Sequence, residues 1–255
     1  MDIDMTQFYL LGELTVLHRG RNCTPSPPMV RKVLAVLMLG ANQVIHVDRL
    51  IEELWDNSPP MSAVTTVQTY IYQLRRAFEA AGITGPAGEV FVTKRPGYIF
   101  VVDPEQIDVQ MFHRLAAEGS ALLEARKPER AAVVLRQALG LWTGPPLENV
   151  ALGRLLEAHA VLLAEERLRA LELRIQADVM LNRHRELIGE LRSLTTVYPL
   201  NEWFHGQLMS ALSRCGRRGE ALDVYRRLHA TLNNELGLDP SPELQRMQRN
   251  VLRAA

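Results

Sequence analysis

The sequence has few cysteines and no long apolar run. Cys23 and Cys215 are the only cysteines among 255 residues, and neither belongs to a CxxC pair. This excludes a disulfide framework and a cysteine-only zinc site. The longest apolar stretch, residues 33–39, is far shorter than the roughly 20 residues that span a bilayer. The acidic start lacks the basic region of a signal peptide. These absences predict a cytoplasmic protein without membrane segments.

Net charge is also absent, because 29 Lys and Arg residues balance 29 Asp and Glu residues. No global field would therefore attract nucleic acid or an anionic membrane. Any binding of nucleic acid must rest on a local patch.

Enzyme signatures are missing as well. The chain contains no GxxxxGK[ST], GxSxG, HExxH or GxGxxG motif, and its seven histidines form no persuasive metal pair. His184 and His205 are expected at helix surfaces. The sequence therefore predicts no catalytic activity, no metal and no cofactor.

Short strands and helices alternate up to about residue 103. Residues 8–18 are rich in β-formers and bend at Gly12. Three helices are then expected: residues 29–40, opened by a proline pair; a helix capped by Asp48 that runs through Trp55; and residues 62–80.

A β-hairpin closes this part of the chain. Its strands are expected at 89–93 and 98–102, joined by Lys94-Arg95-Pro96-Gly97, in which Pro-Gly suits a type II turn. Strands, three helices and a hairpin, in that order, indicate a winged helix with an N-terminal sheet. We assign residues 1–103 to this α+β domain.

Residues 104–108 form a linker, and residues 109–255 have helical periodicity almost throughout. Residues 186–194 align with 220–228 at an offset of 34 residues, which is the tetratricopeptide period. The sequence therefore predicts an all-α, tetratricopeptide-like second domain. Large aromatics such as Trp142, Phe204 and Tyr198 are expected in its core.

The third helix has two distinct faces. The apolar face, expected to pack inward, consists of Ala63, Val67, Ile71, Leu74 and Phe78. The opposite face carries hydroxyl, amide and guanidinium groups and lacks acidic residues before Glu79. Such groups can pair with base edges and phosphates in a major groove.

Basic residues elsewhere in this domain also favour binding to DNA. Lys94 and Arg95 lie at the hairpin tip, where a wing contacts the neighbouring groove or backbone. Arg31, near the start of the first helix, could add a phosphate contact. The candidate DNA-binding residues are Arg31, Thr65, Gln68, Thr69, Tyr72, Gln73, Arg75, Arg76, Lys94 and Arg95.

Several segments strongly resemble the Streptomyces antibiotic regulatory proteins. They are LIEELWDNSPP, TTVQTYIYQLRRAF and VTKRPGYIFVV, together with RRGEALDVYRRLHATLNNELGLDPSPELQRMQRNVL near the C-terminus. The resemblance covers nearly the whole chain, and the segments occur in the family's order and spacing. The chain resembles the short form of this family.

The resemblance implies an OmpR-type winged helix and a tetratricopeptide-like bacterial transcriptional activation domain. It implies an activator for an antibiotic gene cluster that binds promoter direct repeats side by side with other copies and recruits RNA polymerase holoenzyme. Residues 65–76 match the recognition helix and residues 94–98 the wing. Thr69, Tyr72 and Gln73 are expected nearest the bases.

Two other classes of protein remain open. One is a tetratricopeptide adaptor whose winged helix no longer binds DNA but which keeps a protein partner. The other is a regulator that senses a metabolite through its helical domain.

Overall fold

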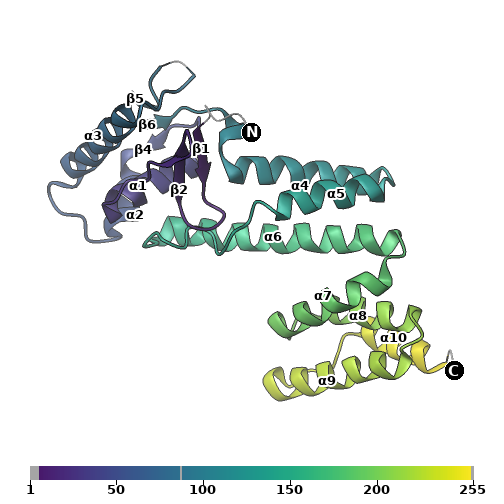
Figure 1. The fold of residues 1–255 in the computed structure, drawn as a ribbon. Helices are drawn as coiled ribbons and strands as arrows, with labels where there is room; N and C mark the ends of the chain where they lie inside the picture. Colours follow the sequence, from purple (N-terminus) through teal and green to yellow (C-terminus); the bar gives the residue numbers. More distant parts are fainter. Residues whose placement is uncertain (1–5, 87, 254–255) are drawn as a thin grey trace. The chain divides into compact units, whose positions relative to one another are not determined.

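The computed structural model describes residues 6–86 and 88–253. The chain forms two compact units, Met1–Arg174 and Ile175–Ala255, and each is described by itself. The division falls inside the long helix α6 (Arg154–Met180), coloured green in Figure 1. The first helices after the winged helix therefore share its compact unit, and the division does not follow the sequence-based linker at 104–108.

An antiparallel sheet begins the first unit. Its strands are β1 (Thr6–Tyr9), β2 (Thr15–His18) and β3 (Arg21–Asn22), in the order β1-β2-β3. Phe8 pairs with Val16, and both side chains are buried. The chain bends between β1 and β2, as predicted, at Gly12, whose φ of 155° favours glycine.

Three helices follow. Helix α1 (Pro28–Leu39) has proline in its first turn, where the missing N–H leaves no partner unsatisfied. In α2 (Val47–Trp55) the predicted Asp48 cap is wrong, because the N-cap is His46, two residues earlier, and Asp48 lies in the first turn. Helix α3 (Ala63–Ala81) follows Ser62, which takes the N-cap position but makes no side-chain cap hydrogen bond.

The wing is the hairpin of β5 (Phe91–Lys94) and β6 (Gly97–Phe100). Strand β4 (Ile45–His46) joins the sheet in the order β4-β6-β5. Lys94 pairs directly with Gly97, and the Arg95–Pro96 peptide bond is cis. Pro96 is thus the second central residue of the turn. The predicted type II turn is wrong because that turn needs a positive φ at this position, which the proline ring does not allow.

Aromatic side chains join the N-terminal sheet, α3 and the wing. Their ring centroids lie between 4.8 and 6.4 Å apart, within the range that favours edge-to-face and offset packing. The four residues are Phe8, Phe78, Phe91 and Phe100. This cluster fixes the wing against the inner face of α3.

A short 3-10 helix (Pro104–Gln106) leads into α4 (Asp108–Glu124), α5 (Pro128–Leu139) and α6. Helices α4 and α5 form a hairpin that lies along α6 (Figure 1). Trp142, after α5, packs edge-on against Phe112 with ring centroids 5.4 Å apart, and the guanidinium of Arg167 on α6 lies 4.9 Å from the Trp142 ring. This cation–π contact ties α6 to the hairpin.

The second unit contains α7 (His184–Val197), α8 (Glu202–Arg214), α9 (Arg218–Leu236) and α10 (Pro242–Arg253). Helices α7 and α9 begin 34 residues apart, at positions 184 and 218, which agrees with the repeat offset in the sequence. Small buried residues, Ala211 and Ala221, allow close helix packing.

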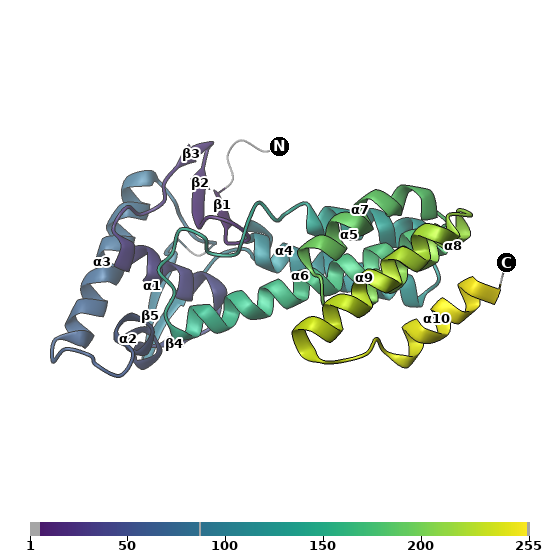
Figure 2. The ribbon, with the colours of Figure 1, turned by 90° about the horizontal axis from the view of Figure 1, so that it is seen from below.

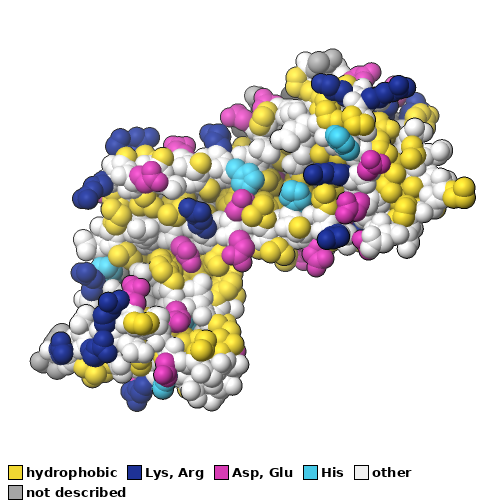
Figure 3. Space-filling view, turned by 180° about the vertical axis from the view of Figure 1, so that it is seen from behind, with side chains coloured by type: hydrophobic (Ala, Val, Ile, Leu, Met, Phe, Trp, Pro, Cys, Tyr) yellow, Lys and Arg dark blue, Asp and Glu magenta, His cyan; other side chains and the backbone are white. Residues whose placement is uncertain are grey.

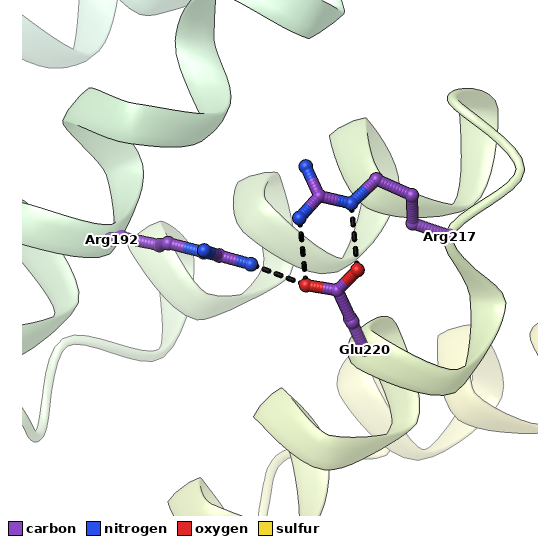
Figure 4. A network of polar contacts seen from close by, with 3 residues as sticks. All are labelled: Arg192, Arg217 and Glu220. Atoms are coloured by element: carbon purple, nitrogen blue, oxygen red, sulfur yellow. Dashed lines mark hydrogen bonds and ion pairs between the residues drawn. The ribbon is translucent and has the colours of Figure 1, made fainter.

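An ionic network connects α7 to the start of α9 (Figure 4). Glu220 accepts two hydrogen bonds from Arg217, at 2.7 and 2.8 Å, and a further one from Arg192. These hydrogen bonds, first those from Arg217, lower the pKa of Glu220. The carboxylate therefore stays charged and bridges adjacent helices.

Two expectations about this unit are wrong. His184 and His205 are buried, not at the surface, and burial lowers the pKa of each. Phe204 is a core residue as expected, as is Trp142 in the first unit, but Tyr198 is 39% exposed. Tyr198 lies just past the end of α7, where its ring packs against that of Phe204.

Candidate nucleic-acid interface

Helix α3 buries the face that its periodicity predicts. Ala63, Val67, Ile71, Leu74 and Phe78 are its buried residues. The helix lies at the outer edge of the winged helix, on the side away from α4–α6, in both ribbon views (Figures 1 and 2). Its polar face is therefore open for contact with a partner.

The open face carries hydrogen-bonding groups of several kinds. Tyr72 is 61% exposed, and the Thr69 hydroxyl donates to the Thr65 carbonyl at 3.0 Å, which leaves its oxygen lone pairs outward. The exposed candidates on this face are Thr65, Gln68, Thr69, Tyr72, Gln73 and Arg76. Amides and hydroxyls both donate and accept, as the edges of bases require.

Charge on this face is weakly compensated. Arg76 lies 3.4 Å from Glu79, and both side chains are mostly exposed, so the pair is screened by water and contributes little. Arg76 can thus exchange Glu79 for a phosphate at small cost.

Arg75 has a different position from its neighbour. Its Nε and Nη2 donate to the carbonyl oxygen of Phe91 at 3.1 and 2.8 Å, and Nη2 also donates to the Thr93 hydroxyl at 2.8 Å. Phe91 and Thr93 belong to β5. Arg75 therefore connects the recognition helix to the wing, a role that the sequence did not indicate.

The wing tip presents two free cations. Lys94 and Arg95 are exposed, and among the described residues no hydrogen bond or ion pair involves either side chain. Arg75 holds β5, the strand that ends at Lys94, against α3. We call these two cations together with the open face of α3 the connected surface of α3 and the wing.

Arg31 does not belong to this surface. Its guanidinium donates to the carbonyl oxygens of Pro25 at 3.2 Å, Ser26 at 3.3 Å and Asn149 at 3.0 Å. The neighbouring Lys32 is buried. Of the basic pair at the start of α1, Lys32 is thus buried, and the half-buried Arg31 is bound to backbone carbonyls.

The wider surface has no single sign of charge. Lys and Arg side chains lie among acidic and hydrophobic ones over the visible face in Figure 3. Among the described residues no group of three or more His, Cys, Asp or Glu could hold a metal, and no helix is long and apolar enough to cross a membrane. The connected surface of α3 and the wing remains the candidate site.

A winged helix with an open, acid-poor recognition helix and a cationic wing, followed by helical hairpins, is the architecture of a transcription regulator. Family models agree with this class. The bacterial transcriptional activator domain matches residues 107–252, and the C-terminal domain of transcriptional regulatory proteins matches residues 23–100.

Known proteins are similar over nearly the whole chain. The regulatory protein DnrI of Streptomyces peucetius is 42% identical over 97% of this chain and 92% of its own length. The transcriptional regulator RedD of Streptomyces coelicolor is 34% identical, and the match covers 88% of this chain and 63% of RedD. The structure of Mycobacterium tuberculosis EmbR in complex with a low affinity phosphopeptide has a TM-score of 0.90 at 32% identity, covering 98% of this chain and 65% of that one.

The chain belongs to the Streptomyces antibiotic regulatory protein family. It is a transcriptional activator with an OmpR-type winged helix and a helical activation domain, and it is not an enzyme. The sequence-based prediction of family, fold and class is therefore confirmed.

Proposed function

We propose that this protein binds direct repeats in promoters of an antibiotic biosynthetic gene cluster and recruits RNA polymerase holoenzyme there. The observation that supports DNA binding is the connected surface of α3 and the wing, which combines an acid-poor polar helix face with two exposed cations. The family supports activation. The protein would act in the cytoplasm, at the nucleoid.

Different residues of this surface have different proposed roles. Thr69, Tyr72 and Gln73 contact base edges in the major groove, flanked by Thr65 and Gln68. Arg76, Lys94 and Arg95 contact phosphates, and one wing cation enters a minor groove. Arg75 holds the wing in place. Arg31 supports DNA binding indirectly, because its hydrogen bonds to backbone carbonyls stabilise the fold.

The test is binding to a promoter fragment with two spaced repeats, against scrambled DNA, over a series of salt concentrations. Specific binding with a steep salt dependence, weakened when one repeat is deleted, is the expected result. It would also show the side-by-side association of two copies. Equal and weak binding to both DNAs would contradict the proposal and favour the adaptor class.

Recruitment of polymerase is tested separately. Purified protein, RNA polymerase holoenzyme and a promoter template should give more transcript than polymerase alone. The same template with scrambled repeats is the control. A gain on both templates would contradict promoter-specific activation.

A second candidate function, regulation by a small ligand, rests on a cavity in the second unit. It has a volume of about 500 Å³ and is lined by α7, α8 and α9, which is within the size range of ligand pockets. Arg227 and His205 are among its lining residues, and the Nδ1 atom of His205 is buried without a hydrogen-bond partner. A thermal shift with pathway intermediates, compared between wild type and Arg227→Ala, tests this candidate.

A further inference from the structure

Glu53 is a buried carboxylate on α2, the helix that supports the recognition helix. It is 2% exposed. Its Oε1 accepts the Gly153 N–H at 2.6 Å, and its Oε2 accepts those of Leu155 at 2.8 Å and Leu156 at 3.1 Å. These amides begin α6 and have no partner inside that helix. A negative charge is also favoured at a helix N-terminus, so Glu53 caps α6 from the winged helix.

Lys32 on α1 balances this charge. Its Nζ lies 3.6 Å from Oε1 of Glu53, and both side chains are almost fully buried. A buried carboxylate without partners would cost several kcal/mol, but here the Glu53 carboxylate is paired with one cation and three N–H donors. The sequence pairs Arg31-Lys32 and Glu52-Glu53 therefore each direct one member into this contact.

Asp108 makes the reciprocal contact. It is the first residue of α4 and is 6% exposed. Its Oδ2 accepts the N–H groups of Leu10 and Leu11, each at 2.8 Å, and both leucines directly follow β1. The winged helix thus gives a carboxylate to α6, and α4 gives one to the N-terminal sheet. We call the Glu53 and Asp108 contacts the carboxylate clasp.

Backbone hydrogen bonds also join the segment after α5 to the segment after β1. The N–H groups of Thr143, Leu147 and Glu148 donate to the carbonyls of Leu11, Leu10 and Gly12 at 2.8, 2.9 and 3.1 Å. Asn149 bonds both polar backbone groups of Leu14.

The packing is too tight for a side chain at the key glycine. A Cβ atom on Gly153 would lie 2.4 Å from the Glu53 carbonyl oxygen. The interface thus has the closeness of a domain core, unlike the wetter and more polar contacts between independently moving domains.

We propose that Glu53 and Asp108 are positioning residues that make the winged helix and α4–α6 one rigid body. Helices α4–α6 then keep a fixed orientation relative to the DNA that α3 reads. The clasp is needed for productive activation more than for DNA affinity, since neither carboxylate lies on the α3 and wing surface. This inference rests on the proposed function.

Glu53→Gln tests the clasp directly. The variant keeps the shape of the side chain but turns an amide N–H₂ toward backbone N–H groups, so it loses acceptors without opening a cavity. Glu52→Gln is the matched control, because Glu52 is exposed on the same helix. Hydrogen exchange should quicken at Gly153, Leu155 and Leu156 in Glu53→Gln, and also at Leu10 and Leu11, which contact the other half of the clasp.

Function is measured on the same two variants. Transcript from a promoter template at saturating protein should fall roughly fivefold in Glu53→Gln, while the Kd for a single repeat changes by less than about twofold. Glu52→Gln should match wild type in both. A purely structural role in the winged helix would weaken DNA affinity together with transcription.

Three outcomes would overturn the proposal: unchanged exchange at Leu10 and Leu11, unchanged transcription, or DNA affinity that falls in step with transcription. Failure of the proposed function is a separate outcome, recognised because wild type itself neither binds the repeats nor activates. The exchange data still decide in that case whether the two halves of the clasp are coupled.

Discussion

Arg75 on α3 donates two hydrogen bonds to the carbonyl oxygen of Phe91 on β5, so the helix that we propose to read DNA also holds the wing. Arg76, the next residue along, is mostly exposed, and within the described part of the chain its side chain pairs with Glu79 on its own helix. Two adjacent arginines therefore have separable roles, one in positioning and one in contact with DNA.

Arg75→Ala should weaken promoter binding without changing its salt dependence. The wing loses its hydrogen bonds to α3, so Lys94 and Arg95 are presented less uniformly. No phosphate contact is removed, and the slope of log K against log salt should stay within about 0.3 of wild type. Fluorescence anisotropy over a salt series measures both quantities. A slope reduced by about one would instead mean that Arg75 contacts phosphate itself.

Arg76→Ala and Arg95→Ala should each weaken binding and also reduce the salt slope by about 0.9, the value for one phosphate contact. Both side chains are exposed, so the melting temperature should not change. Arg246→Ala is the control, because Arg246 is an exposed arginine on α10. Unchanged affinity in both Arg76→Ala and Arg95→Ala would remove the α3 and wing surface from the proposal.

Gln73→Ala and Thr69→Ala should lower discrimination between promoter and scrambled DNA. Each lost base contact should cost about 1–3 kcal/mol on the specific site and almost nothing on scrambled DNA. The ratio of the two Kd values, measured at one salt concentration, is therefore the quantity to follow. Equal losses on both DNAs would assign these residues to the backbone.

Local periodicity accounts for the parts that the sequence predicted correctly. The buried face of α3 follows from apolar residues at helical spacing, and the offset between α7 and α9 follows from similar segments at 34 residues. Both features can be read from the local sequence, without knowing which distant segment packs against these helices.

Burial across distant segments accounts for most of what the sequence did not predict. Glu52 and Glu53 are adjacent and chemically identical, yet only Glu53 is buried, because its partners lie about 100 residues later, at Gly153 and beyond. Lys32 is directed inward by the same contact, whereas Arg31 is held by separate hydrogen bonds to backbone carbonyls. A single sequence does not show which distant segment packs against these residues, so charged residues of this kind are predicted to lie at the surface.

Asp108 gives a pH dependence whose sign is fixed by its burial. Removal from water raises the pKa of Asp108 from 3.8 to about 6, against the lowering effect of hydrogen bonds from Leu11, Leu10 and Val109. The native state therefore binds this proton more tightly than the unfolded state. The contribution of Asp108 to stability is fully present below pH 4 and is lost as the pH rises through about 6, by on the order of 3 kcal/mol.

Asp108→Asn isolates this effect because asparagine does not titrate. Urea unfolding of both proteins between about pH 4.5 and about pH 7.5 gives the difference in free energy of unfolding, in which other titrating groups cancel. Asp108→Asn should gain stability relative to wild type as the pH rises across this range. A constant difference would mean that Asp108 titrates alike in both states, and that the N–H groups of Leu10 and Leu11 fully offset the cost of its burial.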